Sequence, residues 1–221
     1  MNSDLKLHGF QSISKAISPI QIHRLLEVFG VNDRAGRRGV LSIPEVHALA
    51  VSDPIQFLLR PHLPAKPFPV RAIYFDKSPD ANWLVAWHQD QTIAVQERHD
   101  LPGFGPWSVK NGIVHVQPPV ELLEQMVTIR IHLDDADKSN GALRVLPGTH
   151  CLGRLDSATI SRLQTERSEV TCCAAAGDAL LMRPLLLHAS GRSVSSRHRR
   201  VLHIEYSSSE LPGGLAWSER A

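Results

Sequence analysis

The order of two hydrophobic patterns along the chain constrains the fold most. Residues 1–67 carry apolar side chains at helical spacing, whereas residues 68–207 form short alternating segments separated by turn-forming residues. Helices followed by many short strands are typical of an α+β chain whose strands build a sandwich or a jelly roll. We therefore expect a mainly β core with the N-terminal helices packed outside it.

The helical part contains one well-marked helix and several shorter ones. In residues 10–30, FQSISKAISPIQIHRLLEVFG, a helix should open near Ser18 and Pro19 and stop at Gly30. Its apolar residues recur at helical spacing: Ile22, Leu25, Leu26 and Phe29. Residues 37–63 predict short helical pieces that are broken at Pro54 and Pro61.

A length of 221 residues suits one domain with a substantial core. We divide it into a mostly helical cover (1–67), a strand-rich core (68–207) and a C-terminal tail (208–221). Within the core, residues 96–120 are rich in Gly, Pro and aromatic residues and separate two strand segments. A connection this long inside a compact domain is usually a lid or a binding loop.

Composition excludes several classes of partner. The net charge is +2 and no long charged run occurs, so neither nucleic acid nor an anionic membrane surface is expected as a partner. No apolar run approaches the roughly 20 residues of a membrane helix. The start of the chain lacks the pattern of a secretory signal, and three cysteines form no disulfide framework, so we expect a cytoplasmic protein. Twelve histidines hint at metal chemistry.

The segment NWLVAWHQDQTIAV, residues 82–95, reads as a strand that carries an imidazole and a carboxylate two positions apart. On a strand, His88 and Asp90 would project from one face. Both are good ligands for a divalent metal, and a third ligand must come from elsewhere. His188, after an apolar strand and before a Gly turn, is our candidate. Two histidines and one carboxylate are typical of non-haem Fe(II) oxygenases.

A basic residue follows His188 at a fixed distance. Arg199 lies eleven positions on and starts the strand RRVLHIEY, where it shares a face with His203 and Glu205. The opposite face is largely apolar, so Arg199 should point into a polar cavity. A buried guanidinium needs an anionic partner, which a dicarboxylate cosubstrate would supply. Ser190, on the face of His188, could add a hydroxyl contact.

Together these segments resemble a known family. The segments WHQD, NGALRVLPGTH and HASG…RHRRVLHIEY, within residues 68–207, are similar to those of the phytanoyl-CoA dioxygenase family of Fe(II)- and 2-oxoglutarate-dependent oxygenases. The resemblance implies a double-stranded β-helix, a relative of the jelly roll. It also implies Fe(II) ligands at His88, Asp90 and His188, with Arg199 and Ser190 holding the 2-oxoglutarate carboxylate.

The implied reaction oxidises a C–H bond of a small organic substrate with O₂, by hydroxylation or another outcome. It is coupled to the decarboxylation of 2-oxoglutarate to succinate and CO₂. Related halogenases have Gly or Ala where this chain has Asp90, so halogenation is disfavoured. Two alternatives stay open. One is a cupin-like metalloenzyme that does not use 2-oxoglutarate, and the other is a non-catalytic jelly-roll binding module.

Four further residues are candidates for contact with the substrate or cosubstrate. Arg71 shares a strand face with Ile73 and Phe75 and could reach the cosubstrate. Trp107 and His115, in the 96–120 segment, could touch the substrate, although Trp107 could equally pack in the core or lid. Arg130 could line the cavity or form a salt bridge with an acidic neighbour. The sequence indicates a small-molecule substrate and implies no oligomeric state.

Overall fold

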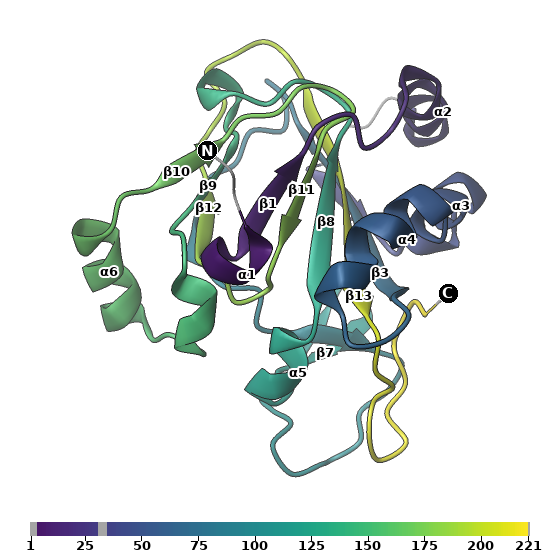
Figure 1. The fold of residues 1–221 in the computed structure, drawn as a ribbon, viewed down its shortest axis with the longest axis vertical. Coiled ribbons are helices and arrows are strands. Elements are labelled where there is room, and N and C mark those ends of the chain that lie inside the picture. Colours follow the sequence, from purple (N-terminus) through teal and green to yellow (C-terminus); the bar gives the residue numbers. More distant parts are fainter. Residues whose placement is uncertain (1–3, 31–34, 221) are drawn as a thin grey trace.

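A computed structural model describes residues 4–30 and 35–220. Its centre is a long antiparallel sheet faced by a shorter one (Figure 1). In the described residues the main sheet has the order β1 (Phe10–Ile13), β11 (Ala179–Met182), β8 (Val127–His132), β13 (Arg199–Ser207), β3 (Phe68–Lys77) and β2 (Gly36–Arg38). The shorter sheet has the order β10 (Val170–Cys172), β9 (Leu143–Val145), β12 (His188–Ser190) and β4 (Val85–His88).

The two faces of the main sheet have different partners because neighbouring side chains on a strand point in opposite directions. One face packs under the N-terminal helices, and its buried side chains include Tyr74, Ile129, Leu202 and Tyr206. The other face meets the shorter sheet, where Leu180 and Met182 pack against Leu143 and Val145. Two facing antiparallel sheets of this kind form a jelly roll, so the expected double-stranded β-helix core with helices outside is confirmed.

Helices cover the outer face of the main sheet, and Figure 1 shows α3 and α4 beside β3 and β13. Helix α2 starts after Ser18, whose side chain forms a reciprocal capping box with Gln21, and ends at Gly30, as predicted. The helices are α1 (Leu5–His8), α2 (Pro19–Phe29), α3 (Pro44–Ala50), α4 (Asp53–Leu59), α5 (Val120–Glu124) and α6 (Ser157–Glu166). Short 3₁₀ turns are η1 (Val40–Ser42), η2 (Arg60–His62), η3 (Lys138–Asn140) and η4 (Thr149–Leu152).

The N-terminal segment is more than a helical cover. Strand β1 pairs with β11 and strand β2 pairs with β3, so residues 1–67 supply both edges of the main sheet. The sequence did not predict either strand. Each is only three or four residues long, and such short strands form because an existing sheet edge offers backbone partners.

Residues 96–120 form a strand pair rather than an open loop. Strands β5 (Ile93–Val95), β7 (Ile113–Val116) and β6 (Trp107–Lys110) make a third sheet. The C-terminal residues expected as a tail pack on it, with Trp217 buried and bridged to Val95. Among the helices of the described residues, none has the length and apolarity needed to cross a membrane.

Candidate metal centre

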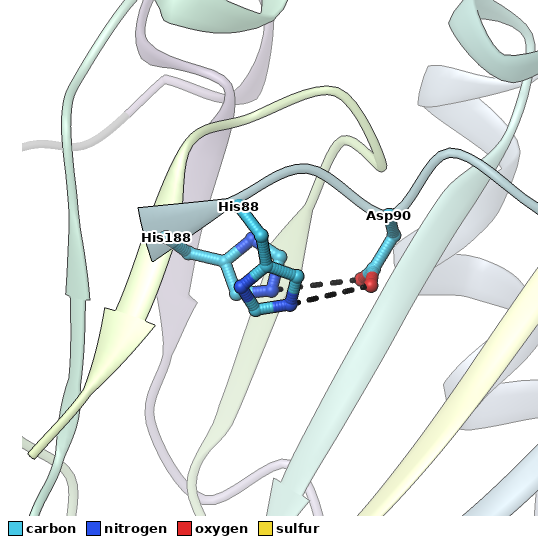
Figure 2. A group of neighbouring side chains, drawn as sticks. All are labelled: His88, Asp90 and His188. Carbon is cyan, nitrogen blue, oxygen red and sulfur yellow. Dashed lines mark ion pairs between the residues drawn. The ribbon is translucent and has the colours of Figure 1, made fainter. Parts of the chain in front are cut away.

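The three candidate metal ligands meet between the two strands β4 and β12. Strand pairing sets His188 directly opposite His88, and their ring centroids lie 4.1 Å apart. The Nε2 atoms of His88 and His188 lie 3.8 and 3.7 Å from the two carboxylate oxygens of Asp90. Figure 2 shows both imidazole edges turned toward that carboxylate. One potential ligand atom from each residue lies within 4.8 Å of the others.

Backbone contacts fix the orientation of both imidazoles. The Nδ1 atom of His88 lies 2.8 Å from the carbonyl oxygen of Ala86, and that of His188 lies 2.9 Å from the carbonyl of Leu186. A carbonyl only accepts, so each Nδ1 carries the proton and donates it. Each Nε2 therefore presents a lone pair toward Asp90, the arrangement that metal-binding histidines use.

The ionisation states also suit a cation. Burial raises the pKa of Asp90, but the imidazoles of His188, His203 and His88 together with Arg71 outweigh burial and lower it to about 2. Burial lowers the pKa of His188 to about 4, against the opposing effect of Asp90. At neutral pH the site thus offers an ionised carboxylate and a neutral imidazole. This donor set fits Fe(II), because two histidines and one carboxylate are the ligands typical of non-haem Fe(II) oxygenases.

Asp90 is positioned by a turn and not, as predicted, by the strand that carries His88. Strand β4 ends at His88, so Asp90 lies beyond the strand, and its backbone N–H donates to the carbonyl of Pro184. Gln89, between the two ligands, is buried and donates to the carbonyls of Gly153 and Leu185. These hydrogen bonds hold the turn, so the convergence of His88 and Asp90 depends on tertiary contacts as well as on strand alternation.

Arg199 lies buried in the interior beside Ser190. Its Nε donates to the carbonyl of Asn140 at 3.2 Å, and its Nη2 lies 3.5 Å from the Ser190 hydroxyl. Its Nη1 has no hydrogen-bond partner among the described residues, although Arg199 is only 2 % exposed. Burial and then the charge of Arg130 lower the pKa of Arg199 to about 9. A buried guanidinium with a free Nη1 and no acidic partner among the described residues points to an anionic ligand.

A second buried cation at this position was missed by the sequence analysis. Lys77 lies opposite Arg199 in the pairing of β3 and β13, and its Nζ donates to the Ser190 hydroxyl and the Gly191 carbonyl. Its Nζ also lies 4.9 Å from the ring centroid of Trp83. The signal was available, because Lys77 continues the face shared by Arg71 and Phe75. Two buried cations therefore converge on one hydroxyl.

A cavity of about 490 Å³ connects the triad with this cationic end. Its wall on the main sheet is built from cross-strand neighbours, since residues directly opposite in paired strands share a face. Ile73 lies opposite His203, which in turn lies opposite Arg130. The other lining residues include Arg38, Arg71, Phe75, Trp83, Val85, Gln91, Thr92, Lys110, Leu143 and Glu205.

Arg71 and Arg130, two of the predicted contact residues, line this cavity and join a buried polar chain. Arg71 Nη1 lies 3.0 Å from Glu205 Oε1, and Arg130 Nη1 lies 2.9 Å from His203 Nδ1. His203 Nε2 lies 3.5 Å from the same Glu205 oxygen. Arg71 is thus engaged by a carboxylate of the protein itself, whereas Arg130 has no carboxylate partner among the described residues and contacts His203 and the ring of Phe75.

Trp107 and His115 lie elsewhere. Trp107 packs at the edge of the cluster around Trp217, with the Arg98 guanidinium 5.5 Å from its ring centroid. His115 is buried on β7, and its Nδ1 donates to the carbonyl of Ile113. Neither belongs to the residues that line the cavity, and from the 96–120 segment Lys110 lines it instead.

Comparison with known proteins places this fold and site. The family model described as phytanoyl-CoA dioxygenase matches residues 8–201. The chain belongs to the phytanoyl-CoA dioxygenase family. Membership makes it a non-haem, iron- and 2-oxoglutarate-dependent dioxygenase that consumes O₂, in keeping with the His-Asp-His group. No curated protein matches the sequence significantly.

Several solved structures share the fold at low sequence identity. AviO1 from Streptomyces viridochromogenes is 20 % identical, with a TM-score of 0.67 and coverage of 95 % of this chain and 94 % of its own. The apoform of EctD from S. alaskensis is 16 % identical, with a TM-score of 0.74 and coverage of 98 % and 82 %. The epimerase SnoN, in complex with Fe³⁺, α-ketoglutarate and nogalamycin RO, is 16 % identical, with a TM-score of 0.69 and coverage of 95 % and 88 %.

Proposed function

We propose that this protein oxidises a C–H bond of a small organic substrate, with hydroxylation as the default outcome. The observation that carries the proposal is the convergence of His88, Asp90 and His188 in one cavity with a buried Arg199 whose Nη1 has no partner among the described residues. The solved relatives act on small molecules, according to their names as an epimerase and a carbocyclase from nogalamycin biosynthesis. Because these relatives catalyse different reactions, the reaction of this chain is inferred from its own residues.

Iron would be held by the Nε2 atoms of the two histidines and by the Asp90 carboxylate. When bound there with 2-oxoglutarate and O₂, it supplies the oxidant for the C–H bond while the cosubstrate becomes succinate and CO₂. The protein's part is to hold both imidazoles as Nδ1–H tautomers through Ala86 and Leu186. Asp90 occupies the position whose loss would favour halogenation, so hydroxylation fits better.

Arg199 and Lys77 would bind the distal carboxylate of 2-oxoglutarate. Both are buried, neither has a carboxylate partner among the described residues, and Ser190 lies between them. A carboxylate accepts hydrogen bonds from both cations and relieves the cost of burying them. A cupin-like enzyme that does not use a dicarboxylate would have no need for these two buried charges. Arg199 and Lys77 therefore favour a 2-oxoglutarate-dependent reaction.

The first test is succinate release that depends on both Fe(II) and 2-oxoglutarate, measured without added substrate and beside the anaerobic visible absorption band of the complex. We expect both signals in the wild type and in Lys66→Ala, which changes an exposed lysine. His88→Ala should lose both, because the metal loses one of its three protein ligands. Equal signals in wild type and His88→Ala would overturn the assignment of the metal site.

The second test separates the cosubstrate clamp from the metal site. Arg199→Gln should weaken 2-oxoglutarate binding at least about thirtyfold, since it removes one partner of a buried charge pair. Its Mn(II) affinity should stay within about twofold, because Arg199 is not a ligand. Calorimetric titration measures both. Arg197→Gln is the matched control, since Arg197 is exposed and pairs with Asp137 at the surface. Weakening of both variants alike would contradict the clamp.

A further inference from the structure

Two cationic side chains line the cavity at its exposed side. Arg38 lies at the end of β2, and Lys110 lies at the end of β6. Both side chains are exposed to solvent, and both line the cavity. Within the described residues, neither forms a hydrogen bond or an ion pair with a protein acceptor. They come from elements far apart in the sequence, and the fold brings both to this cavity.

The pairing of β2 with β3 directs Arg38 into the cavity. Arg38 lies opposite Ile73, which lines the cavity wall, and directly opposite residues share a face of the sheet. The neighbouring Arg37 takes the other face, where its guanidinium lies 6.0 Å from the ring centroid of Phe29. Adjacent arginines on one strand therefore have different environments, and only Arg38 belongs to the cavity.

Lys110 joins the same region from the third sheet. It ends β6 just before the turn at Asn111 and Gly112, whose backbones are left-handed. Burial, and then the charges of Arg71 and Arg38, lower the pKa of Lys110 against the smaller opposing effects of Asp90 and Glu205. Arg38, Arg71 and Lys110 thus line the same cavity, and among the described residues neither Arg38 nor Lys110 has a hydrogen-bonded or ion-paired acidic partner.

The carboxylates of the cavity are already engaged. Five lining residues are Arg or Lys (Arg38, Arg71, Lys110, Arg130 and Arg199) and two are acidic (Asp90 and Glu205). Asp90 belongs to the metal site, and Glu205 is paired with Arg71. Arg130 is buried, and its Nε has no partner in the described part of the chain. A concave wall with this excess of positive charge attracts anions.

We infer that the primary substrate is a small anion, with an apolar body and a carboxylate or phosphate group that Arg38 and Lys110 bind. This rests on the proposed function and adds the substrate class to it. The apolar body would lie along Ile73, Phe75 and Val85, which line the cavity that holds the triad. A cavity of about 490 Å³ lies in the lower half of the usual range for ligand sites, so the substrate is small.

The experiment compares three probes that share a six-carbon chain: hexanoate, hexyl phosphate and the neutral hexanamide. The protein is first titrated with Mn(II) and 2-oxoglutarate, which fills the Arg199 end, and then with each probe in a calorimeter. We expect one of the anions to bind at least about tenfold more tightly than hexanamide. Whichever of hexanoate and hexyl phosphate binds more tightly identifies the anionic group.

The double variant Arg38→Gln/Lys110→Gln should lose this preference, while Mn(II) and 2-oxoglutarate binding remain unchanged. The matched control is Arg37→Gln/Lys66→Gln, which removes the same charge from outside the cavity and should keep the preference. Preference for hexanamide, equal binding of all three probes, or a preference retained by the first double variant would overturn the inference. Failure of Mn(II) and 2-oxoglutarate to bind would instead count against the proposed function. The two double variants would then be compared in the metal-free protein, where the same outcomes apply.

Discussion

At the scale of single residues, Lys77 has the most demanding environment in the site. It is fully buried, and its hydrogen-bond acceptors among the described residues are a hydroxyl and a carbonyl. Burial, followed by the charges of Arg199 and Arg130, lowers its pKa from 10.5 to about 7. In the unliganded protein, burial of the charged ammonium group of Lys77 is unfavourable. A bound carboxylate would stabilise the charged form.

The stability of the unliganded protein should consequently depend on pH above neutrality. Between pH 7 and 10.5 the unfolded chain holds a proton on Lys77 that the native chain releases. The free energy of unfolding should therefore rise with pH through this window and fall as pH returns toward 7. Urea unfolding at several pH values should show a shallower rise in Lys77→Met than in wild type.

Lys66→Met is the control for this comparison, because Lys66 is exposed. Its stability should follow the same pH slope as the wild type. Identical slopes in Lys77→Met and Lys66→Met would mean that Lys77 titrates normally in the native protein. Saturating 2-oxoglutarate should also reduce the slope, since its carboxylate would favour the charged form of Lys77.

Positions of single residues could be predicted from the sequence where residue spacing and strand parity agreed. Arg199 was expected to point inward because its eleven-residue distance from His188 and its strand face gave the same answer, and the structure buries it. Arg38 could not have been assigned in this way. It belongs to a three-residue strand without an apolar alternation, and its direction depends on pairing with Ile73.

At the scale of elements, the turn between η3 and β9 holds the cationic end together. Gly141 has a φ of 75°, and its carbonyl accepts the Ser190 hydroxyl. A Cβ added there would lie 2.5 Å from the Gly191 carbonyl oxygen and 3.2 Å from Lys77 Nζ. The close approach to Gly191 is visible only in the fold, because residues 141 and 191 are far apart in the sequence.

Gly141→Ala should therefore destabilise the protein by more than a left-handed backbone alone would cost. Gly112→Ala is a matched control, because Gly112 has a φ of 78° and nothing lies within 4 Å of its added Cβ. We expect Gly112→Ala to cost about 1–2 kcal/mol of unfolding free energy. Gly141→Ala should cost more and also weaken 2-oxoglutarate binding. Equal losses in both variants, measured by urea unfolding, would argue against the steric contact.

Secondary-structure elements differ in how far their own residues determine whether and where they form. Helix α2 was predicted with both ends because Ser18, Pro19 and Gly30 mark them locally, and the capping box is present in the structure. Strand β1 was read as part of a helical stretch. Its four residues carry no decisive period, and their conformation depends on hydrogen bonds to β11 near the other end of the chain.

At the scale of the whole molecule, the C-terminal residues complete the core. Trp217 is 2 % exposed, and its Nε1 donates to the carbonyl of Ser209. It packs in a cluster with Val95, Val116 and Leu215, which ties the third sheet to the chain end. Residues 208–221 were expected to form a C-terminal tail, and their part in the core becomes visible only in the fold.

Trp217→Ala should lower the free energy of unfolding by about 3–5 kcal/mol, since it removes a large buried side chain and leaves a cavity. Urea unfolding measures the loss. Val194→Ala is the comparison, because Val194 is 89 % exposed and its truncation should change stability by less than about 0.5 kcal/mol. A similar small effect from both would show that the C-terminal residues do not contribute to the core.

The pairing of β1 with β11 also bears on when the molecule can be completed during synthesis. Phe10 lies opposite Met182, so β1 cannot take its place in the sheet until β11 has been synthesised. Contacts between such distant residues are slow to form. Until translation passes β11 and β13, β8 lacks both of its partners in the main sheet, and its unpaired backbone is open to association with other chains.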